Sequence, residues 1–438
     1  MIAESLGKAR IKKLIKEKIF LDNQPNPELI AILTVYFIQG VLGLARLAMS
    51  FFLKDDLGLS PAEVSAITGI ATLPWVIKPL FGFLSDGLPI FGYRRRPYLV
   101  LAGILGALSW ISLATIVHSP WTAICAMVVS SLSVAISDVI VDSLIVERAR
   151  HESMAQTGSL QSLCWGFSAL GGLITAYLGG WLLEHVSNQA VFVITATFPL
   201  IVSGVAWLIT EEAVKNGFNF SGIRKQVGQL RSAISQKSIW LPVAFVFIWQ
   251  ATPGSESAFF FFTTNELGFE PEFLGRVRLV INVAALVGIG FYQGFLKQVP
   301  FRVILGWSIV ISSMLGMTTL LLVTHANRSL GIDDQWFSLG DSLILTLAGQ
   351  IAFMPILVLC ARLCPLGVEA TLFALLMSIL NLAGIVSQEL GALLTHWLGI
   401  TETNFDNLWL LVVITNLSTL LPLPFLHWLP AQEDVMGD

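Results

Sequence analysis

Long apolar stretches alternate with short polar intervals along the whole chain. A helix of about 20 apolar residues crosses the ~30 Å hydrocarbon core of a bilayer, so each stretch is long enough to span a membrane. The pattern predicts an all-α membrane protein with twelve transmembrane helices. We expect them at 29–53, 61–84, 97–118, 120–147, 155–184, 189–210, 239–264, 271–296, 300–325, 339–363, 368–398 and 405–428.

The longest polar interval lies in the middle of the chain and separates the predicted helices into two groups of six. The sequence therefore predicts a cytoplasmic N-terminal segment, a first six-helix half, a cytoplasmic central loop, a second six-helix half and a cytoplasmic tail. These parts are expected at 1–28, 29–210, 211–238, 239–430 and 431–438.

The two predicted halves repeat one another. The sequence DLGLSP at 56–61 matches ELGFEP at 266–271, an offset of 210, and a pair of phenylalanines precedes each. The tripeptide GFL at 82–84 recurs at 294–296, an offset of 212. Two parallel six-helix halves are the plan of the major facilitator fold, in which the substrate site lies between the halves near the midplane. Rocking of one half against the other would give alternating access.

Charged residues are scarce, which agrees with a chain buried in lipid. Asp, Glu, Lys and Arg make up 12% of the sequence, against about 25% in a soluble domain. The net charge of −4 does not favour a nucleic-acid partner. The chain has no HExxH, GxSxG or phosphate-loop motif and no cluster of metal-ligating residues, so we expect neither an enzyme, nor a metal site, nor a cofactor.

The distribution of the basic residues predicts the orientation of the chain. Of the 25 lysines and arginines, 19 fall on one side of the predicted helices, two on the other and four inside them. Basic loops stay in the cytoplasm, so both termini are expected there, with the protein in the plasma (inner) membrane. The first twenty residues lack the apolar core of a signal peptide and are expected to lie on the anionic leaflet.

Ionisable residues inside a membrane helix usually face a cavity or a partner. Arg46 and Glu256 occupy equivalent positions under the 210-residue offset, on helices that face each other in this fold. They either contact the ligand or form a salt bridge that closes one side of the cavity.

Asp138 and Asp142 lie one helical turn apart and share a helix face. Two such carboxylates repel one another, so the pair is expected to bind a proton or to recognise a donor-rich ligand. The alternative is charge pairing with Lys78 or Arg96.

Arg276 and Arg278 lie two residues apart and point to different faces of one helix. One of them is expected to bind a substrate carboxylate, and the other to pair with Glu256 or Glu272. Asn282 lies one turn beyond Arg278 on the same face.

The cytoplasmic ends of the second and fourth helices carry a candidate latch. Asp86 would pair with Arg148 or Arg150, and together with Lys78 and Asp142 these residues are assigned to coupling or gating. Two aromatic–amide pairs within helices are candidates for stacking on a flat ligand, although aromatic residues in membrane helices more often pack. These pairs are Gln161 with Trp165, and Trp249 with Gln250.

Two stretches carry a family resemblance. The sequence GFLSDGLPIFGYRRRP at 82–97, together with SDVIVDSLIVERAR at 137–150, resembles the folate–biopterin transporter family. The resemblance implies a membrane transporter of folate or a related pterin, coupled to protons. We also expect the protein to be a monomer. Asp138 would then accept hydrogen bonds from the pterin, Trp165 or Trp249 would stack on it, and arginines would bind the glutamate tail. Transport of another organic anion and a non-transporting receptor remain the alternatives.

Overall fold

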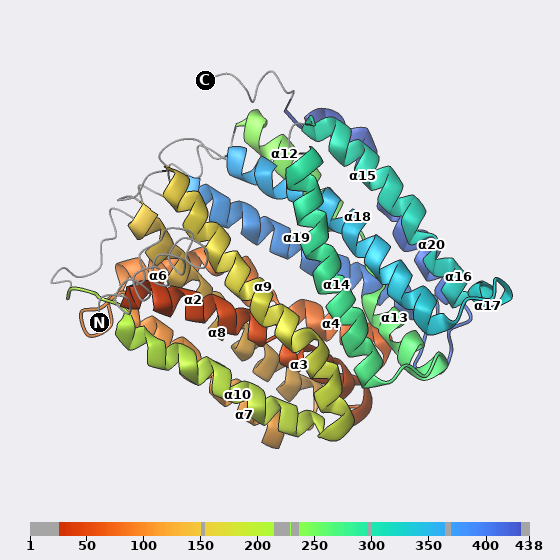
Figure 1. The fold of residues 1–438 in the computed structure, drawn as a ribbon, viewed down its shortest axis with the longest axis horizontal. Helices are drawn as coiled ribbons and strands as arrows, with labels where there is room; N and C mark the ends of the chain where they lie inside the picture. The colour runs from red at the N-terminus through yellow and green to blue at the C-terminus, as the bar shows by residue number, and fades with distance from the viewer. Residues whose placement is uncertain are drawn as a thin grey trace, which may run out of the picture.

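The computed structural model describes residues 26–149, 154–213, 228, 236–296, 299–363 and 369–430. Within these ranges the chain is helical apart from its turns, and its only β-pairing is an isolated bridge between Ile90 and Tyr93. The predicted fold class is confirmed. The first half occupies one side of the molecule and the second half the other (Figure 1).

The helices of the first half follow the hydropathy pattern closely. Proline and glycine interrupt the first two spans, which therefore consist of shorter helices in sequence. The elements are α2 (Pro27–Val41), α3 (Leu44–Phe51), η1 (Phe52–Asp56), α4 (Pro61–Ala71), α5 (Leu73–Val76), α6 (Lys78–Gly87), α7 (Arg96–Thr115), α8 (Pro120–Ala149), α9 (Met154–His185), α10 (Asn188–Val205) and η2 (Ala206–Leu208).

The second half repeats this series. Its elements are α12 (Lys237–Gln250), α13 (Glu256–Phe261), η3 (Phe262–Glu266), α14 (Pro271–Phe291), η4 (Tyr292–Leu296), α15 (Phe301–Gly316), α16 (Thr319–Val323), α17 (Ala326–Ser329), α18 (Asp334–Arg362), α19 (Glu369–Trp397), α20 (Leu408–Ser418) and η5 (Leu423–Trp428).

Eleven stretches of the described chain are long and apolar enough to cross a membrane. The remaining predicted span, the seventh at 239–264, is broken, which corrects the expectation of one continuous helix. Helix α12 ends at Gln250, and α13 begins at Glu256. Pro253 cannot continue the helical hydrogen bonding, and a Cβ at Gly391 would overlap the Gly254 carbonyl. The break therefore allows the backbone to lie close against α19.

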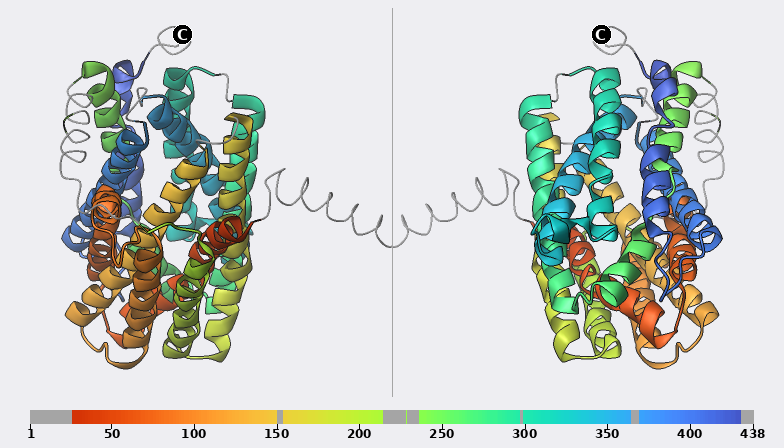
Figure 2. Two further views of the ribbon diagram at one scale, coloured as in Figure 1. Left: turned by 90° about the vertical axis from the view of Figure 1, so that its left-hand side faces the viewer. Right: turned by 90° about the vertical axis from the view of Figure 1, so that its right-hand side faces the viewer.

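The internal repeat is visible in the backbone. The π-helical turns η1 and η3 are offset by 210 residues, and each is followed by a glycine in the left-handed region, Gly58 at φ +63° and Gly268 at φ +65°. The contact between the halves has the same symmetry. Helix α9 of the first half packs on α14 of the second. The symmetry-related pair, α19 of the second half and α4 of the first, packs in the same way (Figures 1 and 2).

The start of α7 is fixed by a residue from the end of the first half. The Glu211 carboxylate accepts hydrogen bonds from the backbone N–H groups of Arg94 (2.5 Å), Arg95 (3.0 Å) and Arg96 (3.2 Å). These groups have no partner within the helix, and a negative charge at a helix N-terminus is favourable. Glu211 thus ties the loop before α7 to the segment that leads into the central loop.

Candidate functional site

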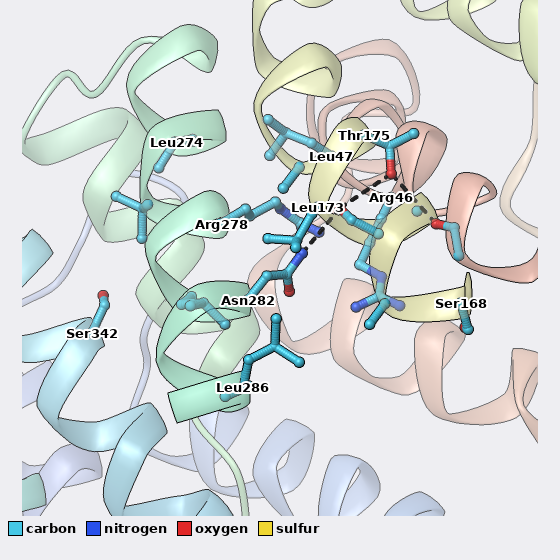
Figure 3. A pocket seen from close by; sticks show the side chains of 18 of the residues that line it. Arg46, Leu47, Ser168, Leu173, Thr175, Leu274, Arg278, Asn282, Leu286 and Ser342 are labelled. Carbon is cyan, nitrogen blue, oxygen red and sulfur yellow. Dashed lines mark hydrogen bonds between the residues drawn. The ribbon is translucent and has the colours of Figure 1, made fainter. Parts of the chain in front are cut away.

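A cavity of about 700 Å³ lies between the two halves. Helices α2, α3 and α9 line it from the first half, and α13, α14 and α18 from the second (Figure 3). Ligand pockets for small molecules commonly measure about 300–1,000 Å³. The cavity therefore has the place and the size expected for a substrate site in this fold.

Two arginines from opposite halves reach this cavity. Arg46 comes from α3 and Arg278 from α14, and both side chains extend into the space between the helices (Figure 3). Neither guanidinium group forms a hydrogen bond or ion pair with any residue in the described ranges, and their two positive charges repel one another. Cations held in a membrane protein without a counter-ion favour an anionic ligand.

Glu256 also borders the cavity, as the first residue of α13 after the break in the seventh span. No ion pair joins Glu256 to Arg46 in the described part of the chain. The salt bridge considered from the sequence is therefore absent from this conformation. The carboxylate of Glu256 and both guanidinium groups are available to a ligand.

The wall between the arginines supplies amide and aromatic groups. Asn282, one turn beyond Arg278, donates from Nδ2 to the Gly172 carbonyl of the opposite half at 3.0 Å. Trp165 lines the cavity from α9, and 63% of its surface is exposed. A flat exposed aromatic face next to charged groups suits a ligand with both a ring and a charge.

Arg276 lies outside the cavity and forms the ion pair with Glu272 that was expected of one of the two arginines. It pairs with Glu272 at 2.7 Å, and the Tyr177 hydroxyl of α9 donates to the same carboxylate at 2.9 Å. The helical spacing correctly separated Arg276 from Arg278 but did not say which of them borders the cavity. Arg276 belongs to the contact between the halves.

The second predicted aromatic–amide pair also lies away from the cavity. Trp249 stacks on Phe353 with ring centroids 6.3 Å apart, inside the second half. Gln250 lies beside Gly384 of α19. Neither residue lines the cavity that we take as the candidate site. The side chain of Gln161 lies outside the described residues.

A charged network lies beside the cavity within the first half. Lys78 binds both Asp138 and Asp142, the latter at 3.2 Å. Gln39 Nε2 donates to Asp138 Oδ1 at 3.1 Å, and the Tyr36 hydroxyl donates to Asp142 Oδ1 at 2.5 Å. The donors Tyr36 and Gln39 lie three residues apart on α2, and the acceptors Asp138 and Asp142 lie four residues apart on α8. The Lys78 ammonium of α6 binds both acceptors. Tyr36 was not expected from the sequence.

The structure places Asp138 in this network and not on the cavity wall. Its side chain is 12% exposed and does not line the cavity, and its partners are those of the charge-pairing alternative. Arg96 is not among them, because its Nε donates to the Ile209 carbonyl at 2.6 Å. The side chains of Asp86 and Arg148, and all of Arg150, lie outside the described residues, so the predicted latch stays a prediction.

The halves are in close contact at the end of the bundle that carries η1 and η3, which we call the closed end. A Cβ on Gly180 of α9 would overlap the Gly275 backbone of α14. The Phe51 and Phe260 rings meet edge to face with centroids 5.2 Å apart. At the second contact between the halves, where α4 packs on α19, the Ser65 hydroxyl donates to Gln388 Oε1 at 3.0 Å.

Comparison with known proteins places this geometry in context. The model of the BT1 family matches residues 39–438. A protein of Synechocystis named folate-biopterin transporter is 62% identical, over 98% of this chain and 87% of its own length. A probable folate-biopterin transporter 2 of Arabidopsis thaliana is 35% identical, over 93% and 85%. Folate transporter 1 of Plasmodium falciparum is 33% identical, over 95% and 83%.

Solved structures with similar folds are major facilitator transporters. A nucleoside transporter superposes with a TM-score of 0.68 at 12% identity, covering 92% of this chain and 98% of its own. A D-xylose–proton symporter superposes with a TM-score of 0.66 at 14% identity, with the same coverage. At such low identity the likeness establishes the fold alone.

Proposed function

This chain belongs to the BT1 family of integral membrane transporters, and from that membership we propose that it carries folate or a related pterin by proton-coupled alternating access. The observation that carries the proposal is the pair of unpaired arginines in a cavity between the halves. The names of the relatives support the cargo. The cavity fits an anion that also has a flat ring.

The cargo can be assigned to the cavity group by group. Arg46 and Arg278 bind the carboxylates of the glutamate tail, because a guanidinium forms two parallel hydrogen bonds with a carboxylate. Glu256 accepts hydrogen bonds from the amino group and ring N–H of the pterin. Trp165 stacks on the ring. Glu256 replaces Asp138 as the pterin acceptor, because the oxygens of Asp138 are already bound by Lys78 and Gln39.

The closed end supports alternating access. One hydrogen bond between the halves, from Asn381 to the Trp75 carbonyl, lies about halfway along the bundle. The other direct hydrogen bonds between the halves lie on the cavity wall or toward the closed end. None joins the halves at the opposite end within the described ranges. With both termini in the cytoplasm of a plasma-membrane protein, this conformation is closed to the outside. Rocking about the cavity would open that end and close the other.

The network beside the cavity supports proton coupling. Two carboxylates share one ammonium, so the group carries one excess negative charge and can take up one proton. One chain supplies both halves and the whole cavity, and we propose that it acts as a monomer.

Uptake of labelled folate into vesicles, with and without an inward proton gradient, tests the proposal. We expect accumulation that the gradient increases and that unlabelled pterins inhibit. Stronger inhibition by an unrelated organic anion than by folate would identify another cargo. Binding without accumulation would indicate a receptor.

A further inference from the structure

Gln39 belongs both to the cavity and to the charged network. It lies near the end of α2 and borders the cavity, and its Nε2 donates to Asp138 Oδ1 at 3.1 Å. Of the five network residues, Gln39 alone lines the cavity in the described chain. Its amide oxygen Oε1 accepts no hydrogen bond from a described residue and is not buried. Gln39 therefore keeps a free acceptor in a side chain that borders the cavity.

The hydrogen bonds of the network identify its protonation state. All four carboxylate oxygens accept: Asp138 from Gln39 and Lys78, and Asp142 from Tyr36 and Lys78. A protonated carboxyl group must donate one hydrogen bond. Either aspartate can therefore gain a proton at one of these hydrogen-bonded positions and keep the hydrogen bond only if the neighbour there changes from donor to acceptor. Lysine has no acceptor, which leaves the Gln39 amide and the Tyr36 hydroxyl.

Of these two neighbours, only the amide can pass the change to a ligand. A glutamine amide has a donor on one side and an acceptor on the other, so a half-turn about its last bond exchanges them. Tyr36 binds Asp142, whose side chain is 43% exposed, and it does not border the cavity. Asp138 is the more buried carboxylate at 12%.

We propose that Gln39 is an amide switch that links protonation of Asp138 to anion binding in the cavity; this inference rests on the proposed proton-coupled function. With Asp138 ionised, Nε2 is held by the carboxylate and Oε1 faces the cavity, where it repels an anion. When a proton binds Asp138, the new hydroxyl donates to Oε1. The amide has then turned, and its NH₂ group faces the cavity and donates to a substrate carboxylate. Proton and anion thus favour the same orientation, and no proton passes through Gln39.

The surroundings of Asp138 contain few other charges. The titratable groups that face it are Asp142 on its own helix, Tyr36 on α2 and Lys78 on α6, with Cys164 of α9 behind Tyr36. Helix α5 has no titratable residue. Those on α4 and α7 are bound elsewhere: Glu63 to Ser60, Arg96 to the Ile209 carbonyl, and Tyr98 to the Leu88 carbonyl.

The test compares Gln39→Met with Gln189→Met. Gln189 also donates to an aspartate, Asp56 at 2.8 Å, but neither residue lines the cavity. In wild type and Gln189→Met, folate affinity should rise about 10- to 100-fold from neutral to acidic pH, a usual size for coupling between two sites. In Gln39→Met the affinity should be lower and nearly independent of pH. Folate counterflow should persist at raised KM, while accumulation driven by a pH gradient is lost.

Binding by purified protein, followed as folate-dependent thermal stabilisation, gives a result even if a variant does not transport. Gln39→Glu, which preserves the shape but presents only acceptors when ionised, should show a steeper pH dependence than wild type. Wild-type pH dependence in folded Gln39→Met, or a flat response in Gln39→Glu, would overturn the switch. Absence of pH dependence in wild type would instead refute the proposed proton coupling.

Discussion

Lys78 should hold two repelling carboxylates together, and replacing it with methionine tests this directly. Methionine retains much of the apolar stem and removes the ammonium that binds Asp138 and Asp142. Residues four apart on a helix lie about 5.5 Å apart. At an effective dielectric constant of about 20, two charges at that separation repel by about 3 kcal/mol. In the wild type the attraction of both carboxylates to Lys78 offsets this repulsion, and in the variant nothing offsets it. Because the Asp142 side chain is 43% exposed, solvent screening reduces the expected loss to about 2 kcal/mol.

The loss should appear as a lower unfolding temperature of the detergent-purified protein. If the six-helix half unfolds as a unit, about 2 kcal/mol corresponds to about 4–8 °C. The effect should depend on pH in one direction. At high pH both carboxylates of Lys78→Met are ionised and repel, whereas at low pH a bound proton relieves the repulsion. The destabilisation should therefore be largest near pH 8 and shrink toward pH 5.

Lys54→Met is the matched control, because Lys54 binds a single carboxylate, Asp55, at 2.8 Å, and that carboxylate is half exposed. We expect a change of about 0–1 kcal/mol there. Adding Asp142→Asn to Lys78→Met should recover most of the lost stability. An unchanged unfolding temperature in Lys78→Met at pH 8, or a loss that does not depend on pH, would refute this account of the network.

Three further predictions concern the cavity, the closed end and the start of α7. Arg278→Gln should raise the KM for folate about 30- to 100-fold, since an unpaired buried substrate charge costs at least about 2 kcal/mol; Arg276→Gln, on the other face of the helix, should change it less than about threefold. Gly275→Leu should leave the protein folded but reduce uptake at least about tenfold, because its side chain would separate α9 from α14 and prevent the halves from closing. Glu211→Ala should lower the free energy of unfolding by about 1 kcal/mol, measured by thermal denaturation, because the first N–H groups of α7 lose their acceptor.

Each of these predictions has an opposing result. Equal KM values for the two arginine variants would remove Arg278 from the site. Normal uptake by Gly275→Leu would show that close packing of α9 on α14 is not needed for transport. Unchanged stability in Glu211→Ala would mean that water replaces the carboxylate at no cost.

The spans were predictable because hydropathy is a local property. Eleven of the twelve segments appear at the expected places as long apolar helices. The seventh is broken at Pro253 and Gly254, where a backbone contact with Gly391 of α19 exploits the break. That contact joins residues more than one hundred positions apart, so the sequence gives no sign of it.

The candidate site was predictable where one helix or the repeat determined it. The 210-residue offset placed Arg46 and Glu256 on facing helices, and helical spacing placed Asn282 with Arg278. The rotation of a helix against its neighbours depends on packing, which is why Trp249 lies in a core and not in the cavity. Tyr36 was missed because a tyrosine in an apolar helix is ordinary until its partner on α8 is known.

The most direct test of the account is the proton movement that folate itself evokes. Purified protein is reconstituted into lightly buffered liposomes that contain a pH-sensitive dye, with equal pH on both sides. Adding folate outside should acidify the interior as protons enter with the substrate, and Arg278→Gln should give little response at the same concentration. Folate entry without any change of internal pH would contradict the proton coupling, and failure of folate to enter would contradict the assigned cargo.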